Sequence, residues 1–283
     1  MRTAIVGDIG GQIDVFHDVV TSLGGDIRTG KFPDGLRVIQ VGDIVRFNPH
    51  PDLDSLACAE LAEKLIQANN GNYIQLLGNH ETPLLGGALD PHWATTDLPE
   101  CRAIVKSWWN DAKASIGAVL TAPGEKDILI THAGLTRGYM EHLGVSTAKE
   151  AVSLMNGFVG EVNLGGIERP GWLVTGSHNQ AADTFWALCG IELNGSWWGE
   201  EGSGFNQIHG HACLYEWDGG EFWPDVSPEI RRNTLVNMAD RFTITQHPNG
   251  DWFRSVDWVL KNERKRQKWP VLILPGFDVY LGE

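Results

Sequence analysis

The first third of the chain alternates short apolar runs with stretches of helical periodicity. Apolar runs lie at residues 4–6, 36–41 and 73–77, and the stretches 13–23 and 53–68 carry apolar side chains at helical spacing. Strands that alternate with helices in this way are typical of βα units in an α/β fold. Each of the three runs is followed by glycine and then by aspartate or asparagine. Because strand ends on one edge of such a sheet converge on one crevice, we expect a polar site there.

The rest of the chain is less regular. We expect a helix around residues 99–116 and strands at 118–121 and 128–131. Residues 136–205 are rich in glycine and tryptophan and predict an irregular insertion. Residues 241–283 predict a β-hairpin followed by a tail. A chain of 283 residues without a low-complexity linker is expected to form one elaborated domain, covering 1–283.

The charge balance argues against some classes of partner. The formal net charge is −14, whereas binding to nucleic-acid duplexes or membrane surfaces depends mostly on a basic face. The basic run at residues 261–268, KNERKRQK, is therefore interpreted as a solvated helix face or tail. No stretch resembles a signal peptide or a bilayer span, and the four cysteines form no close pair. We expect a cytoplasmic protein with reduced thiols.

Five polar residues lie at or just past the ends of apolar runs. They are Asp8, Asp43, Asn79, His132 and His211. Two carboxylates, one amide oxygen and two imidazoles can bind two divalent cations if one carboxylate bridges the ions. The set therefore predicts a hydrolytic metal site.

These residues stand in the ordered motifs GDIGG, GDIVR, GNHE, HAGL and HGHAC between residues 7 and 213. The series resembles the calcineurin-like metallophosphoesterases, which include phosphoprotein phosphatases and bis-nucleoside tetraphosphatases. The resemblance implies two packed mixed β-sheets flanked by helices, a four-layer sandwich.

The same resemblance implies a two-metal site. Asp8 would belong to the first metal, Asp43 would bridge, and Asn79, His132 and His211 would hold the second metal. His80 would be the general acid or the stabiliser of the leaving group. We expect two divalent ions, manganese before iron, zinc or magnesium.

The first motif departs from the family pattern, GDxHG. Gly10 stands where the family has a histidine ligand of the first metal. Gln12, two residues on, either returns an amide oxygen to that metal or is a solvated residue of the first helical turn.

The second motif departs from GDxxDRG, because Arg46 and Phe47 replace the Asp-Arg pair. The partner of His80 is therefore open. Arg46 either reaches the phosphoryl oxygens through its guanidinium or forms a surface ion pair with Asp52 or Asp54. Cys213 stands at the second histidine position of GHxH, as a soft ligand or a buried inert thiol.

The function expected is metal-dependent phosphoesterase activity, in which a metal-activated hydroxide attacks phosphorus. The substrate expected is a small phosphorylated molecule or a phosphoprotein. Dinucleoside polyphosphates are favoured if a tryptophan of the insertion borders the metals, namely Trp172, Trp186, Trp197 or Trp198. The alternative is a degenerate, non-catalytic member that binds phosphate or a partner.

Overall fold

The structure is a computed structural model that describes residues 1–47, 53–93, 98–160, 164–199, 201–257 and 271–282. The basic run at 261–268 lies outside these residues. Among the described residues, no helix is long and apolar enough to cross a membrane.

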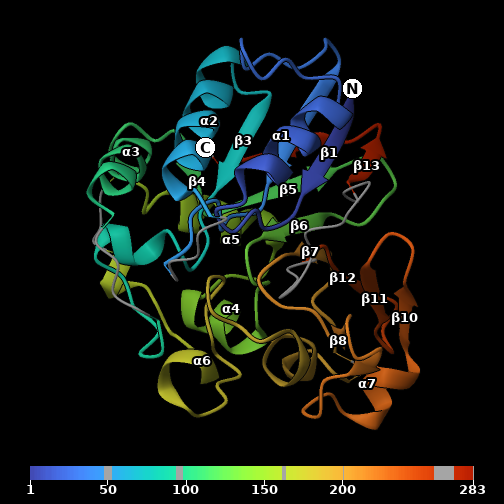
Figure 1. The fold of residues 1–283 in the computed structure, drawn as a ribbon. Helices are drawn as coiled ribbons and strands as arrows, with labels where there is room; N and C mark the ends of the chain where they lie inside the picture. Colours follow the sequence, from blue (N-terminus) through green and yellow to red (C-terminus); the bar gives the residue numbers. More distant parts are fainter. Residues whose placement is uncertain (48–52, 94–97, 161–163, 200, 258–270, 283) are drawn as a thin grey trace.

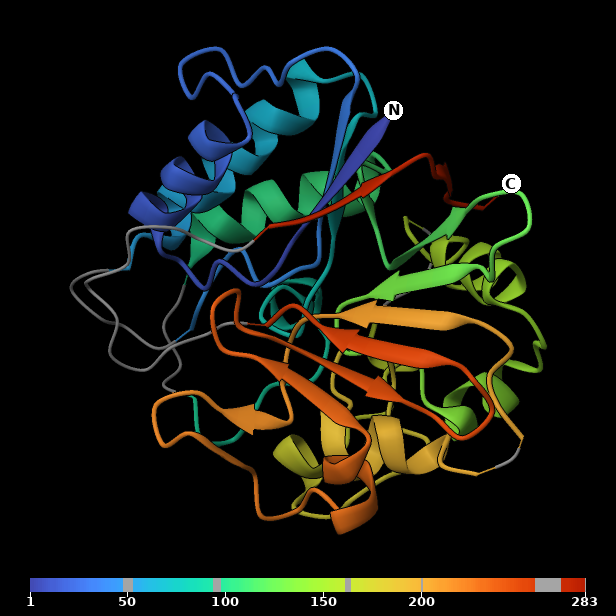
Figure 2. The same cartoon turned by 90° about the vertical axis from the view of Figure 1, so that its right-hand side faces the viewer.

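The first sheet has five strands. Their order is β13 (Leu272–Pro275), β1 (Arg2–Val6), β2 (Leu36–Gln40), β3 (Tyr73–Leu76) and β4 (Ala114–Ser115). Strands β1 to β4 run parallel and β13 pairs antiparallel with β1. The parallel strands are connected through α1 (Ile13–Ser22), α2 (Ser55–Ala68) and α3 (Pro99–Asn110), and Figure 2 shows α1 and α2 against one face of the sheet.

The second sheet has seven strands. Their order is β10 (Thr234–Asn237), β11 (Phe242–Gln246), β12 (Trp252–Ser255), β7 (Asn206–His209), β6 (Ile128–Thr131), β5 (Gly117–Thr121) and β14 (Asp278–Tyr280). Strands β12, β7 and β6 run parallel, and the other pairs are antiparallel. Helix α5 (Ala148–Asn156) packs against β5. The expected architecture of two packed mixed sheets with helices outside is confirmed (Figure 1).

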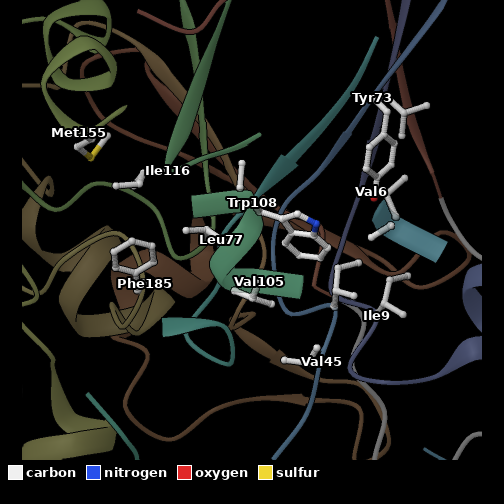
Figure 3. Packing of buried hydrophobic residues seen from close by; sticks show 14 of the residues in the cluster. Val6, Ile9, Val45, Tyr73, Leu77, Val105, Trp108, Ile116, Met155 and Phe185 are labelled. Atoms are coloured by element: carbon white, nitrogen blue, oxygen red, sulfur yellow. The ribbon is translucent and has the colours of Figure 1, made fainter. Parts of the chain in front are cut away.

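Alternation along the strands builds the layers, because successive side chains point to opposite faces. Ile5 of β1 and Ile39 of β2 join a cluster with Ile130 and Ile208 of the other sheet, so this cluster is the core between the sheets. The other faces contribute to a larger cluster that the helices cover. In Figure 3, Trp108 of α3 lies within that cluster.

Three parts of the chain differ from the sequence-based expectation. The 136–205 segment is less irregular than predicted, because Thr136 and Thr147 cap the helices α4 (Arg137–Leu143) and α5. The predicted tail contributes β13 to one sheet and β14 to the other, since its apolar run continues as strand pairing. The predicted helix at 99–116 ends at Asn110, before β4.

The remaining elements are short. They are β8 (Tyr215–Glu216), β9 (Glu221–Phe222), α6 (Trp172–Thr175), α7 (Pro228–Arg232) and helical turns at Thr82–Leu85, Leu164–Gly166 and Cys189–Asn194.

Candidate metal centre

The predicted polar residues come from parallel strands of both sheets. Asp8, Asp43 and Asn79 follow β1, β2 and β3, while His132 and His211 follow β6 and β7. The two sheets are tied at these ends, since Nδ1 of His132 lies 2.9 Å from the Val41 carbonyl oxygen and the His211 amide donates to Asp8. All of these residues except His211 are nearly fully buried.

Asp43, His132 and His211 place ligand atoms within 4.8 Å of one another. The outer atom of the Asn79 amide lies among them, 2.9 Å from Nε2 of His132 and 3.1 Å from Nδ1 of His211. The same position is 3.1 and 3.2 Å from the two carboxylate oxygens of Asp43. Ligands about 2.1 Å from one octahedral ion are about 3 Å apart, so these spacings fit a shared cation.

The hydrogen bonds fix which ring nitrogen of His132 faces this position. Its Nδ1 lies 2.9 Å from the carbonyl oxygen of Val41, and a carbonyl only accepts. Nδ1 therefore carries the hydrogen, and Nε2 turns its lone pair inward. Burial lowers the pKa of His132 to about 3, so the ring is neutral at pH 7.

The donor set fits a metal on chemical grounds. The His132 nitrogen and the Asp43 oxygens are acceptors that face one another, and the Asn79 oxygen would be another. Such a group is satisfied either by an inward amide nitrogen or by a cation that all the acceptors share. Neutral imidazole, amide oxygen and carboxylate together suit a borderline divalent ion.

Glu81 holds the loops that carry these ligands. Its carboxylate accepts backbone N–H groups of Asp43, Ile44 and Val45 at 2.8, 2.9 and 3.1 Å, and that of Gly78 at 2.7 Å. Burial raises the pKa of Glu81, although the four amides lower it. One buried carboxylate thus joins the loop after β2 to the loop after β3.

The backbone is strained or crowded at these ligands. Asp43 and His211 have φ of 54° and 60°, a region that residues other than glycine rarely occupy. A Cβ at Gly78 would lie 2.2 Å from Oδ1 of Asp43, and one at Gly210 would lie 2.2 Å from Oδ1 of Asp8. Glycine is required at both positions because a carboxylate occupies the space.

Asp8 lies beside this group, outside the three residues whose ligand atoms cluster. The backbone N–H of His211 donates to its two carboxylate oxygens at 3.3 and 3.1 Å. Burial raises the pKa of Asp8, and the neighbouring charges of Asp257 and Asp43 raise it further. A carboxylate in such surroundings gains most from a bound cation.

His80 lies next to Asp43, within a group of stacked aromatic rings. Its ring is 4.0 Å from that of Trp93 between centroids, at 10°, and Trp93 also stacks on Phe47 and Trp186. The backbone N–H of Phe47 donates to Nδ1 of His80 over a long 3.4 Å. Nε2 therefore carries the hydrogen of the neutral ring, 3.9 Å from Oδ2 of Asp43.

The family model for calcineurin-like phosphoesterases matches residues 1–239. The chain belongs to this family. Among solved structures, a cold-active protein-tyrosine phosphatase of a psychrophile Shewanella sp. is 15% identical with a TM-score of 0.44, covering 88% of this chain and 76% of that one. A protein proposed to be a diadenosine tetraphosphatase is 16% identical with a TM-score of 0.35, covering 100% and 94%. Scores this low carry no argument about this chain. No curated protein matches.

In this phosphoesterase, the space beside Gly10 contains an arginine. Gly10 has φ of 59°, and a Cβ built on it would lie 3.5 Å from a guanidinium nitrogen of Arg46. Burial and the charge of Glu81 raise the pKa of Asp43, which the charge of Arg46 lowers only in part, whereas burial and then Arg46 lower the pKa of His80. Asp54 instead accepts the Ala57 amide at the start of α2, and Asp52 lies outside the described residues.

Gln12 precedes α1, and its Nε2 donates to the carbonyl oxygen of Ile9 at 3.3 Å. This contact turns the amide nitrogen toward the chain, and metal ligation by its oxygen stays a prediction. Cys213 donates its thiol hydrogen to the Tyr215 carbonyl, and burial raises the pKa of this thiol to about 12. Without a metal Cys213 is therefore a neutral thiol, and its role as a soft ligand or an inert thiol stays a prediction.

Sequence reasoning missed Trp93. This residue lies between the helical turn Thr82–Leu85 and α3, and it follows no periodic pattern. It also missed Asp257, although this aspartate follows a strand as the predicted ligands do.

Of the predicted tryptophans, Trp186 and Trp197 are buried. Their indole Nε1–H groups donate to the Glu168 carboxylate and to the Leu135 carbonyl. Trp172 is 46% exposed and stacks on His178, and Trp198 packs near His247.

Proposed function

We propose that this chain hydrolyses phosphate esters at a site for two divalent metal ions. The observation that carries the proposal is the convergence of Asp43, His132 and His211 on the outer atom of the Asn79 amide. In the proposed site these four residues would hold the second metal, and Asp43 would also hold the first metal together with Asp8.

The local charge balance supports bound cations. Asp8, Asp43, Glu81 and Asp257 are buried acids near one another, and Arg46 is a positive side chain that acts on Asp43. Burial of a carboxylate costs on the order of several kcal/mol, and a bound cation offsets that cost. When bound, divalent cations lower the pKa of a water and neutralise charge on phosphoryl oxygens. Manganese is the proposed metal, because the ligand set mixes carboxylate, amide and imidazole.

Two side chains serve the substrate in this proposal. Arg46 lies next to Asp43 and His80, where its planar guanidinium can donate two hydrogen bonds to phosphoryl oxygens. His80 accepts the Phe47 amide at Nδ1, so its Nε2–H is available to donate to the departing oxygen. Trp93 keeps the His80 ring in one plane by stacking on it.

The proposed substrate is a small phosphorylated molecule or a phosphoprotein. The half-buried Trp93 beside His80 favours a nucleotide, since a base that stacks on the exposed part of its ring would gain up to about 1–3 kcal/mol. We therefore expect a dinucleoside polyphosphate to be hydrolysed with a higher kcat/KM than a phosphopeptide. A panel that contains both substrates and a generic aryl phosphate measures this difference, and a phosphopeptide preference would reverse the assignment.

The second candidate is a non-catalytic protein that binds a phosphorylated partner. It is favoured by Gly10 in place of a ligand and by Arg46 and Phe47 in place of the family's Asp-Arg pair.

The deciding experiment measures metal content together with hydrolysis of an aryl phosphate in added manganese. Manganese-dependent turnover that a chelator abolishes supports the enzyme. Manganese binding without turnover across the substrate panel supports the second candidate. Wild-type protein that binds no manganese overturns the metal site. We place this activity in the cytoplasm, for which the four free thiols are the support.

A further inference from the structure

Asp257 follows the last strand that reaches the metal centre. Strand β12 runs parallel to β7, with Ser255 paired to His209 and the Val256 amide donating to the His209 carbonyl at 2.8 Å. Asp257 and His211 each lie two residues beyond this last pair, and the His211 amide donates to Asp8. Figure 2 shows β12 and β7 side by side in the second sheet. Asp257 is buried, with 6% of its surface exposed.

The electrostatic neighbours of Asp8 point to the same place. After burial, Asp257 raises the pKa of Asp8 more than any other charge does, ahead of Asp43 and Glu81. Asp257 also raises the pKa of Asp43, by a smaller effect. The geometry agrees, because Oγ of Ser255 donates to the Ala212 carbonyl at 3.2 Å and accepts the Asp257 amide at 3.3 Å, so the end of β12 lies against the segment that carries His211.

We propose that Asp257 is a ligand of the first metal and supplies the donor that Gly10 lacks. This inference rests on the two-metal function proposed above. The first site then consists of Asp8, Asp43 and Asp257, whereas the second contains two imidazoles and an amide. A site made of carboxylates is harder, and it favours manganese or magnesium over softer ions.

Neighbouring side chains are engaged elsewhere. Cys213 donates its thiol hydrogen to the Tyr215 carbonyl, and the amide nitrogen of Gln12 donates to Ile9. Arg46 lies against Gly10 and is a cation, so it cannot replace the missing histidine as a ligand. Asp257 brings an anionic oxygen from a different strand, without requiring a side chain at position 10.

The test is manganese titration of the wild-type chain and of Asp257→Asn, monitored by calorimetry and by electron paramagnetic resonance. The wild type is expected to bind two ions, with the coupled spectrum of a manganese pair. Asp257→Asn should keep one ion at wild-type affinity and bind the other at least about tenfold more weakly, with a mononuclear spectrum. Two ions at wild-type affinities in Asp257→Asn would overturn the role of Asp257.

A matched control is Asp251→Asn, because Asp251 is another buried aspartate six residues earlier, about 20 Å away along β12. It forms an ion pair with Lys126 and should lower the melting temperature without changing the manganese stoichiometry. A stoichiometry that falls equally in both variants would mean that Asp257 acts only through folding. Wild-type protein that binds fewer than two ions would instead contradict the two-metal function itself.

A second measurement separates ligation from structural support. Manganese should raise the melting temperature of Asp257→Asn by less than it raises that of the wild type. The rise is taken relative to the metal-free melting temperature of each protein, so a change in the metal-free stability of the variant does not enter the comparison. A manganese-induced rise in Asp257→Asn that equals the wild-type rise would overturn the proposal.

Discussion

The substitution Glu81→Gln tests whether one buried carboxylate organises the metal ligands. Each carboxylate oxygen of Glu81 accepts two backbone amides, and glutamine replaces one oxygen with a donor. Two hydrogen bonds to a charged group are then lost, each worth about 1.5–3 kcal/mol. The neutral amide recovers part of the cost of burying a charge. We therefore expect the free energy of unfolding to fall by about 3 kcal/mol, the lower end of the range for two such bonds.

For a chain of this size, that loss corresponds to a fall of about 6 °C in the melting temperature of the metal-free protein. The loops that carry Asp43 and Asn79 also lose their common anchor, so manganese affinity should fall by about 10–100-fold. Circular dichroism during heating and manganese titration measure the two effects. A melting temperature within about 2 °C of the wild type, with unchanged affinity, would refute this account of Glu81.

Glu192→Gln is the matched control for this substitution. Glu192 is fully buried, and it accepts the backbone amides of Trp172, Asn179 and Leu188. Its substitution should lower the melting temperature by a comparable amount and leave manganese affinity unchanged. A loss of affinity in both variants would assign the effect of Glu81→Gln to general destabilisation.

Four further predictions concern the metal centre. Asp43→Asn should abolish hydrolysis and reduce the metal content at both positions, and wild-type turnover would contradict a bridging role. The variant His80→Ala should keep its metal, and its kcat at saturating substrate should fall by on the order of a hundredfold. Loss of the metal in this variant would indicate that His80 is a ligand. Gln12→Ala should weaken the weaker manganese site and Gln12→His should tighten it if Gln12 is a ligand, and titration curves that do not change would leave Gln12 as a helix-start residue. In the metal-free protein, ionisation of Asp8, whose pKa burial raises, costs stability as pH rises above its unfolded pKa of about 4, so metal-free Asp8→Asn should gain in melting temperature over the wild type as pH rises. A melting-temperature difference between the two metal-free proteins that does not grow with pH would contradict this reasoning.

The strand ends were predictable because neighbouring residues in the sequence mark them. A glycine and a polar residue directly after an apolar run mark a strand end, and parallel pairing of β1, β2 and β3 brings three such ends to one edge. Two packed mixed sheets followed from the family resemblance, and the structure confirms them. The choice of Asn79, His132 and His211 as members of one cluster came from the same resemblance, and the ligand role of each stays a prediction.

The missed features depend on pairing between distant segments. Asp257 reaches the centre only because β12 pairs parallel with β7, whereas the sequence reveals just the local hairpin with β11. Trp93 contacts His80 through tertiary packing, and no periodic pattern leads to that contact. The C-terminal strand β13 pairs with β1 across almost the whole chain, so its position could not be read from neighbouring residues.

The departures from the family pattern form one consistent rearrangement when the charges are compared. The family has a neutral histidine at position 10 and an Asp-Arg pair where this chain has Arg46 and Phe47. Here the arginine moves one position earlier and lies against Gly10, where a side chain would have to share its space. If Asp257 is a metal ligand as proposed, its carboxylate offsets the one absent from position 46 and brings an oxygen donor where the family has an imidazole. On that proposal the formal charge around the two metals equals that of the family pattern, which is expected of an altered catalytic site rather than of a site that has only lost a ligand.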